Sequence, residues 1–224
     1  MPELVVASDV MTGDDGRTVI TTRFSGLDLP PVWLALPEGA RPDQYSETDL
    51  GNVSLGLGLL AAMHHGTELR VAHPVSPRLL AGAAEYQVIM STWFPEAVGP
   101  VAVHAENGAE LRVPGSGEAS FFSGGVDSFD TLLRNRSTLT ALVFVAGFDI
   151  PVDRVDAIER TRPHLRAVAD ATGMQLWELQ TNVRALFDRI GSWGHHTHGA
   201  ALGTVALALA VVPRDVVQVG LLQA

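Results

Sequence analysis

Residues 119–134 place a glycine-rich turn between a short apolar strand and an amphipathic helix. The segment begins with Ala-Ser-Phe-Phe, continues as Ser-Gly-Gly-Val-Asp-Ser over residues 123–128, and ends with Phe-Asp-Thr-Leu-Leu-Arg. The two glycines let the backbone bend sharply and bring bare N–H groups close to an anion. A helix that begins near Val126 directs its free N–H groups and its positive dipole end at the same point. The segment predicts a phosphate-binding loop.

Polar side chains of the loop suit a nucleotide and a hard cation. Ser123 and Ser128 supply hydroxyl donors at the two ends, and Asp127 supplies one carboxylate of the kind that binds Mg²⁺. The Gly-Lys-Ser/Thr of a Walker loop is absent, so the loop belongs to another class. The alternative is a Ser/Gly-rich turn that only caps a helix.

From residue 119 onward, expected strands alternate with expected helices, a pattern typical of an α/β fold with a parallel sheet. The first helix places Val126, Phe129, Leu132 and Leu133 on one face. Strands are predicted at 119–122, 140–147, 175–180 and 216–221, with helices from Val126, over 153–172 with a bend or break at Pro163, over 181–191 and over 198–210.

The preceding part of the chain predicts a smaller, mixed α+β domain. Its expected elements are a hairpin of strands 4–9 and 17–24, a strand at 31–36, a helix at 48–65, a strand at 69–72, a helix from Pro77 to before Pro95, and an edge strand at 101–104. A stretch rich in Gly, Pro and Ser at 113–118 then predicts a boundary between domains 1–115 and 116–224.

Two further segments contain candidate site residues. Gly147 and Asp149 follow the second strand of the parallel sheet, where a glycine can admit a nucleotide and the carboxylate can lie near a ribose or a metal ion. An ordinary turn with a helix-capping Asp explains them equally well. His195, His196 and His198 suggest a metal site, but their spacing does not converge well and a loop that starts an apolar helix is favoured. We retain His198 as a contact to substrate or phosphate.

Composition excludes several classes of function. The chain has no cysteine, which rules out disulfides, thiolate zinc sites, iron–sulfur clusters and persulfide relays. The formal net charge of −10 argues against a nucleic-acid-binding surface. All basic residues are arginine, so any role of a phosphate-binding lysine falls to arginine. The longest apolar run, 199–213, is short for a membrane span, and no signal peptide is evident. We therefore expect a cytoplasmic protein with no membrane partner.

The Ser-Gly-Gly-Val-Asp-Ser loop resembles the SGGxDS signature of the PP-loop ATP pyrophosphatases, the superfamily of the GMP, NAD and asparagine synthetases. With the segments 143–151 and 193–202, the chain looks like an uncharacterised bacterial group related to 7-cyano-7-deazaguanine synthase. The resemblance implies an adenine-nucleotide alpha hydrolase-like (HUP) fold and the cofactors ATP and Mg²⁺. It implies phosphate contacts from Ser123, Gly124, Gly125, Val126 and Ser128, and Mg²⁺ binding by Asp127.

The resemblance further implies an ATP-dependent ligase. Such an enzyme adenylates a carboxyl or amide-type oxygen of a small-molecule acceptor, releases pyrophosphate, and lets a nitrogen nucleophile displace AMP. Members of the group continue past the fourth strand, so the C-terminal part looks truncated here. A nucleotide-binding relative without turnover therefore stays open, as does a homo-oligomer or a partner chain that completes the fold. A tRNA-modifying enzyme is the third alternative, which the acidic charge and missing cysteines oppose.

Overall fold

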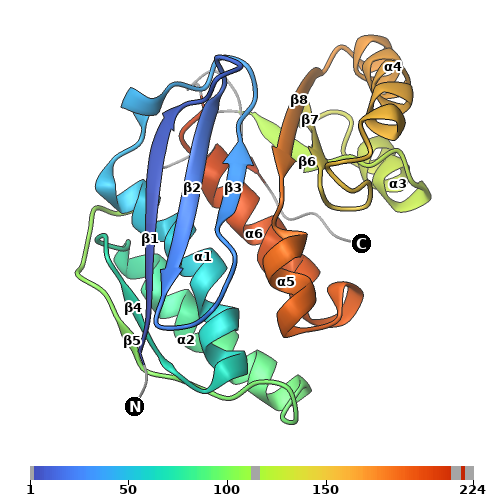
Figure 1. Cartoon of the computed structure of the whole chain (residues 1–224). Helices are drawn as coiled ribbons and strands as arrows, with labels where there is room; N and C mark the ends of the chain where they lie inside the picture. The colour runs from blue at the N-terminus through green and yellow to red at the C-terminus, as the bar shows by residue number, and fades with distance from the viewer. Residues whose placement is uncertain (1–2, 112–116, 213–217, 220–224) are drawn as a thin grey trace.

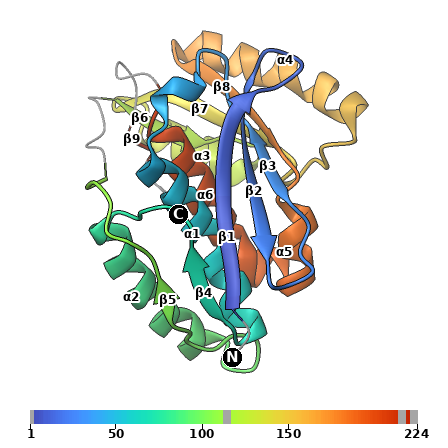
Figure 2. The same ribbon diagram turned by 60° about the vertical axis from the view of Figure 1, so that its left-hand side comes forward.

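The computed structural model describes residues 3–111, 117–212 and 218–219 of the chain (Figure 1). Within these residues nine strands form one sheet, in the order β5-β4-β1-β2-β3-β8-β7-β6-β9. Helices lie on both sides of β6, β7 and β8, whereas they cover only one side of β1, β2 and β3 (Figures 1 and 2). The α/β class and the mostly parallel sheet with flanking helices are thus confirmed.

The N-terminal strands pair around a long hairpin, as predicted. β1 (Glu3–Thr12) and β2 (Thr18–Ser25) are antiparallel, and β2 is also antiparallel to β3 (Val32–Ala35). On its other side β1 is parallel to β4 (Glu68–Val71), which in turn pairs with the predicted edge strand β5 (Val103–His104).

The C-terminal strands form the predicted parallel array. They are β6 (Glu118–Phe121), β7 (Leu139–Ala146), β8 (Gln175–Thr181) and β9 (Gln218–Val219). Their spatial order is β8-β7-β6-β9, so the third, second, first and fourth strands of this part follow one another. Because the direction of chain progression reverses between β6 and β9, a topological switch point lies beside β6. The rest of the predicted strand 216–221 lies outside the described residues.

Alternation along β7 explains how two helical layers hold this sheet. Leu142, Phe144 and Ala146 face one core with α3 (Val126–Arg134) and α4 (Val155–Thr172), which continues through Pro163. The intervening residues Ala141, Val143 and Val145 face the main core with α5 (Arg184–Ile190) and α6 (His198–Leu209). A strand that is buried on both faces has a nearly continuous apolar sequence, and residues 140–147 have such a sequence.

The glycine-rich segment 48–65 is a helix, as predicted. α1 (Glu47–His65) begins at Ser46, whose side chain and that of Asp49 form a capping box. The helix is buried on nearly every side and packs against β1, β4 and α6. A Cβ at Gly51 would lie 2.0 Å from the Pro74 carbonyl oxygen, so this glycine permits close packing. The next helix, α2 (Pro77–Trp93), starts at its predicted cap, Ser76. A short 3-10 helix, η1, covers Pro42–Gln44.

The apolar face predicted for the first helix of the parallel array differs from the observed one. Leu132 is buried at 1% exposure and Phe129 packs edge-on against Phe122, but Val126 and Leu133 are 85% and 67% exposed. The helix therefore buries Leu132 and packs Phe129 against Phe122, as the predicted face requires, but leaves the Val126 and Leu133 side chains of that face exposed.

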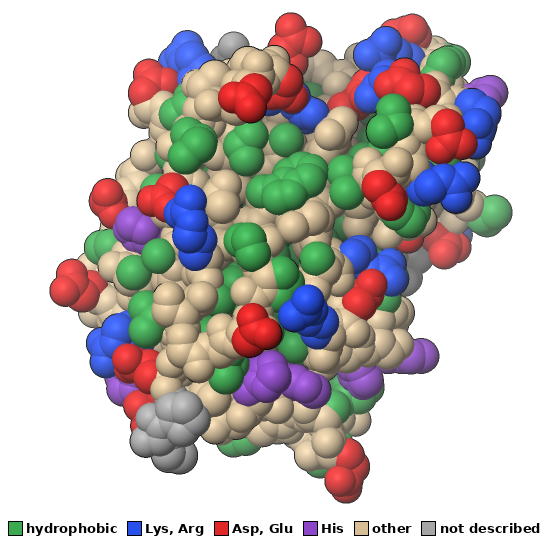
Figure 3. Space-filling model, viewed as in Figure 1, with side chains coloured by type: hydrophobic (Ala, Val, Ile, Leu, Met, Phe, Trp, Pro, Cys, Tyr) green, Lys and Arg blue, Asp and Glu red, His purple; other side chains and the backbone are tan. Residues whose placement is uncertain are grey.

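Ion pairs link the partly exposed side of α4 to itself and to β8. Arg162 contacts both Glu159 and Glu178, and Arg166 lies 3.2 Å from Glu178. Figure 3 shows the mixed blue and red side chains over this helix, at the upper right. Within the described residues, no helix combines the length and apolarity that crossing a membrane requires.

The antiparallel pair β3–β8 joins the two predicted domains in one sheet. Thr181 Oγ1 donates to the Trp33 carbonyl oxygen at 2.7 Å, and Asn182 accepts from the Trp33 N–H at 2.8 Å. Arg17 extends from β2 and its guanidinium donates to the carbonyl oxygens of Leu36 and Glu178. The boundary predicted at residue 115 lies outside the described residues and stays a prediction.

Candidate functional site

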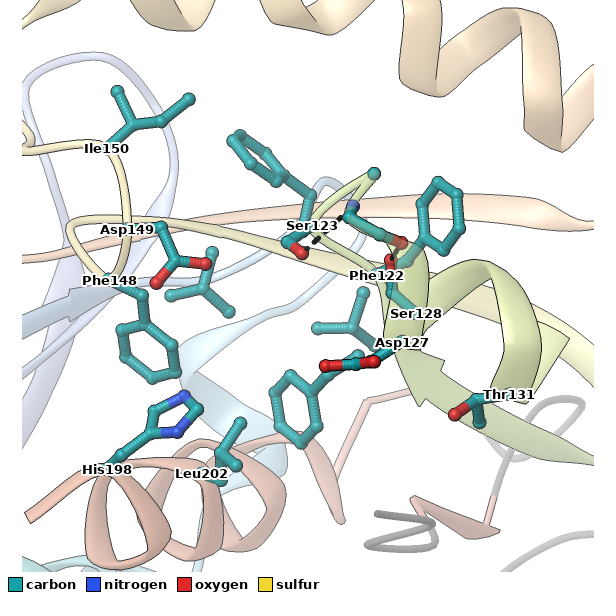
Figure 4. A pocket seen from close by; sticks show the side chains of 16 residues that line it. Phe122, Ser123, Asp127, Ser128, Thr131, Phe148, Asp149, Ile150, His198 and Leu202 are labelled. Atoms are coloured by element: carbon teal, nitrogen blue, oxygen red, sulfur yellow. Dashed lines mark hydrogen bonds between the residues drawn. The ribbon is translucent and has the colours of Figure 1, made fainter. Parts of the chain in front are cut away.

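A cavity of about 730 Å³ opens at the carboxyl ends of β6 and β7. The predicted phosphate loop forms one side, β7 and the turn after it form another, and α6 contributes His198 and Leu202 (Figure 4). The position beside the topological switch point is where open α/β sheets bind ligands. The lining residues are Phe121, Phe122, Ser123, Gly124, Gly125, Asp127, Ser128, Thr131, Val143, Phe144, Val145, Phe148, Asp149, Ile150, His198 and Leu202.

The loop between β6 and α3 adopts a conformation suited to an anion. Gly124 has a φ of +83°, a conformation that favours glycine, and Gly125 is the residue that caps α3. Ser123 Oγ accepts from the Gly125 N–H at 3.3 Å, and Ser128 Oγ donates to the Gly125 carbonyl oxygen at 2.8 Å. The side chains thus brace the loop from within, and the first-turn N–H groups of α3 lack intrahelical partners. The loop can offer backbone donors to a phosphate.

Asp127 is exposed in the first turn of α3 and points into the cavity (Figure 4). Mg²⁺ in nucleotide sites is bound by one or two carboxylates, substrate phosphates and water. A single carboxylate beside a phosphate loop fits this donor set. When bound, the ion would neutralise charge on the phosphates.

The turn after β7 assigns different roles to its two candidate residues. Asp149 lines the cavity, whereas Gly147 does not. Gly147 has a φ of +107°, and a Cβ there would lie 1.8 Å from the Thr181 carbonyl oxygen. Its N–H also donates to the Ile150 carbonyl oxygen at 2.8 Å. Close packing on the neighbouring strand β8 is therefore enough to explain this glycine.

The three histidines at the start of α6 also separate by role. His196 lies in a single π-helical turn, η2 (Trp193–Thr197), where its Nδ1 accepts from the Ser192 N–H at 3.0 Å. The His196 ring also packs edge-on against Phe94, with centroids 4.4 Å apart. His195 is exposed, and His198 alone of the three lines the cavity. The structure therefore does not bring the three imidazoles to one point.

Potential metal ligands converge elsewhere. Over the described ranges, the cluster whose ligand atoms all lie within 4.8 Å of one another is Glu3, Glu68 and His104 on β1, β4 and β5. Ion pairs already engage all three members: Arg70 lies 2.8 Å from Glu3, and His104 lies 3.0 Å from Glu68. None of these residues lines the cavity.

His198 is held in a cluster of rings. The Trp193 and His198 rings lie 4.9 Å apart, and Phe148 packs edge-on against both. The Arg184 guanidinium covers the Trp193 ring at 4.4 Å from its centroid. Burial lowers the pKa of His198; Asp149 acts in the opposite direction and Arg184 in the same direction. The imidazole is therefore neutral at neutral pH.

Most predicted site residues meet at the cavity. Gly147 and Val126 do not line it, and the Val126 side chain is exposed. Sequence reasoning missed Thr131, which lies one helical turn after Asp127 and could have been found from that spacing. It also missed Phe148, Trp193 and Arg184, which only tertiary packing brings beside His198. The predicted residues that line the cavity are Ser123, Gly124, Gly125, Asp127, Ser128, Asp149 and His198.

Comparison of the chain with protein-family models, with curated proteins and with solved structures finds no match. The functional argument therefore rests on the loop, the cavity and the strand order described above.

Proposed function

We propose that this chain is a PP-loop protein of the HUP type that binds ATP with Mg²⁺ in the cavity beside β6. The observation that carries the proposal is the Ser-Gly-Gly-Val-Asp-Ser loop, which lines a cavity at the carboxyl end of the first strand of a parallel array. The β8-β7-β6-β9 order supports this reading, because nucleotides bind at such switch points.

We assign a different role in phosphate binding to each group of loop residues. In this proposal the N–H groups of Gly124 and of the first turn of α3 donate to the departing pyrophosphate, and the helix dipole adds positive potential. Ser123 and Ser128 hold the loop in shape and present hydroxyl groups at its two ends. Asp127 binds Mg²⁺, which withdraws charge from the phosphates when bound.

The proposed reaction is an ATP-dependent ligation. An oxygen of a small acceptor, a carboxylate or an amide-type oxygen, attacks the α-phosphorus of ATP, and the bond to pyrophosphate breaks with its electron pair on pyrophosphate. A nitrogen nucleophile then attacks the activated carbon, and AMP leaves with the electron pair of the broken C–O bond. Catalysis in this arrangement is mainly electrostatic and positional.

A second candidate function is nucleotide binding without turnover. The residues that line the cavity include no arginine, and the chain has no lysine. A triphosphate bound there meets backbone donors and Mg²⁺ but no basic side chain from the described lining. This observation weakens the case for pyrophosphate release and leaves the case for binding unchanged.

Pyrophosphate exchange into ATP tests both candidates. A panel of small carboxylic acids is added to the protein with ATP, Mg²⁺ and labelled pyrophosphate, and exchange above the acid-free rate identifies adenylation. We expect Asp127→Asn to lower the exchange rate by about 100-fold or more, because it removes the Mg²⁺ carboxylate. Asp130→Asn is the matched control, since Asp130 pairs with Arg134 at 2.7 Å and does not line the cavity.

Thermal unfolding separates the two candidates. A ligand that binds the native state stabilises it by RT ln(1 + [L]/Kd), so Mg²⁺-ATP raises Tm under either candidate. Stabilisation without exchange for any acid supports binding alone. Absence of stabilisation, or equal stabilisation of the Asp127→Asn protein, contradicts the proposed Mg²⁺-ATP site itself. Retention on immobilised tRNA at physiological salt would favour the tRNA-modifying alternative.

A further inference from the structure

Opposite the side of the cavity that holds Ser128 and Thr131, a carboxylate and an imidazole face the same space. Asp149 lies beside Phe148 after β7, and His198 lies on the far side of the Phe148 ring (Figure 4). Within the described residues, Asp149 makes no ion pair or hydrogen bond, and no ring nitrogen of His198 has a hydrogen-bond partner. Asp149 is exposed and His198 is half-buried, so a ligand that enters the cavity can reach both groups.

The protein fixes the position of His198 rather than leaving it free to turn. Trp193 packs against one side of the imidazole and Phe148 lies edge-on to it. Arg184 in turn lies on Trp193, and hydrogen bonds to Asp188 at 2.7 Å and to the Phe148 carbonyl oxygen at 3.3 Å restrain its guanidinium. A chain of packed groups of this kind preorganises a binding residue.

The chemistry of this pair selects a donor with positive charge. An ionised carboxylate only accepts hydrogen bonds, and a neutral imidazole offers one nitrogen that accepts. Arg184 already covers the Trp193 ring and acts on His198, but it lies outside the cavity lining. Within the lining, Asp149 is the charged group beside His198, and it attracts a protonated amine and repels an acid or a phosphate.

We propose that Asp149 and His198 form a subsite for a protonated amine, the ammonium ion or a primary alkylammonium ion. The inference rests on the proposed function, in which the bound amine, after it loses a proton, supplies the nitrogen nucleophile. Asp149 pairs with the positive charge, and the free ring nitrogen of His198 accepts one N–H. Phe148 and Trp193 act as positioning residues that hold the imidazole.

Nuclear magnetic resonance of the full chain with labelled histidine tests the subsite directly. The His198 ring signals, assigned by their loss in His198→Gln, are followed during titration with ammonium chloride at constant ionic strength and neutral pH. We expect a saturable shift with ammonium or methylammonium and none with tetramethylammonium, which has no N–H donor. Comparing the affinities for ammonium and for methylammonium then tells whether ammonia or a primary amine is the natural ligand.

Asp149→Asn provides the decisive variant. Losing the charge of a paired carboxylate should weaken ammonium binding about tenfold or more. Asp153→Asn is the matched control, because Asp153 is exposed four residues further on and does not line the cavity. Equal binding by both variants, or an equal shift with tetramethylammonium, would overturn the subsite.

The same titration in the presence of Mg²⁺ and a non-hydrolysable ATP analogue separates this inference from the proposed function. Ammonium binding that persists with the analogue supports an amine subsite beside the nucleotide. Displacement of ammonium by the analogue assigns Asp149 to the nucleotide and contradicts the inference. Ammonium binding without any pyrophosphate exchange leaves the subsite intact and contradicts only the ligase reaction.

Discussion

At Gly147 the chain leaves β7 through a turn that any other residue type could adopt only with strain. Its φ of +107° lies in a region that L side chains rarely adopt, and β8 passes so close that a Cβ would meet the Thr181 carbonyl oxygen at 1.8 Å. Glycines near a nucleotide site are often attributed to the ligand. Here the neighbouring strand already accounts for the residue.

Substitution at this position tests that explanation. We expect Gly147→Ala to lower the free energy of unfolding by about 3 kcal/mol or more, because backbone strain adds to a backbone clash. Gly66→Ala is the control: Gly66 has a φ of +61° with nothing within 4 Å of the added Cβ, and should cost about 1 kcal/mol. Denaturant unfolding measures both. Equal losses would show that the contact with Thr181 is unimportant.

The sequence predicted the site residues that depend on local chemistry and missed those that depend on packing. The loop residues Ser123 to Ser128 form a contiguous motif, and a contiguous motif can be read directly. Trp193 and Arg184 lie 45 and 36 residues from Phe148, and nothing local indicates that they meet it. For the same reason the sequence alone could not show that His196 contacts Ser192 and Phe94.

At the scale of the element, helical periodicity identified α3 and part of its buried face. Of the four predicted residues, Leu132 is buried and Phe129 packs against Phe122, whereas Val126 and Leu133 are exposed. The direction in which the helix leaves the loop at Gly125 decides which of these residues are covered, and periodicity alone does not give that direction.

Two adjacent leucines make this difference measurable. Leu132→Ala should lower the free energy of unfolding by about 2–4 kcal/mol, because it leaves a cavity in a buried cluster. Leu133→Ala should change it by less than about 0.5 kcal/mol, because that side chain is largely exposed. Urea unfolding of both variants gives the comparison. A larger loss for Leu133→Ala would mean that Leu133, and not Leu132, is the buried member of the predicted face.

Element existence was predicted well throughout the chain, because most strands and helices here have clear boundaries. The Ser46 and Ser76 caps and the αL glycines Gly66 and Gly173 mark helix ends in the sequence as in the structure. Strand pairing was harder. That β3 would pair with β8 requires contacts between residues more than 140 positions apart, and no local pattern encodes such a pairing.

At the scale of the whole molecule, a single arginine ties three segments together. The Arg17 guanidinium donates to the carbonyl oxygens of Ala35, Leu36 and Glu178, at distances from 2.7 to 3.1 Å. The first two lie at and just after the end of β3, and the third lies in β8. Arg17 therefore binds the N-terminal hairpin to the parallel array at the one antiparallel junction between them.

Loss of this side chain should weaken the molecule as a unit. We expect Arg17→Ala to lower the free energy of unfolding by about 2–4 kcal/mol, because several partly buried carbonyl groups lose a charged donor. Arg41→Ala is the control, since Arg41 contacts only the exposed Asp43 at 3.3 Å among charged groups and should cost at most about 0.5 kcal/mol. Circular dichroism and Trp fluorescence should report one coincident transition. Two separate transitions would contradict a shared folding unit.

The pairing of β3 with β8 also bears on how the part of the chain that contains the cavity can be prepared. A fragment that begins at residue 117 would leave the β8 edge bare, with its N–H and carbonyl groups free to template pairing with another molecule. We expect such a fragment to aggregate, even though it contains the whole cavity lining. The N-terminal strands thus protect the edge of the parallel array from pairing with copies of itself.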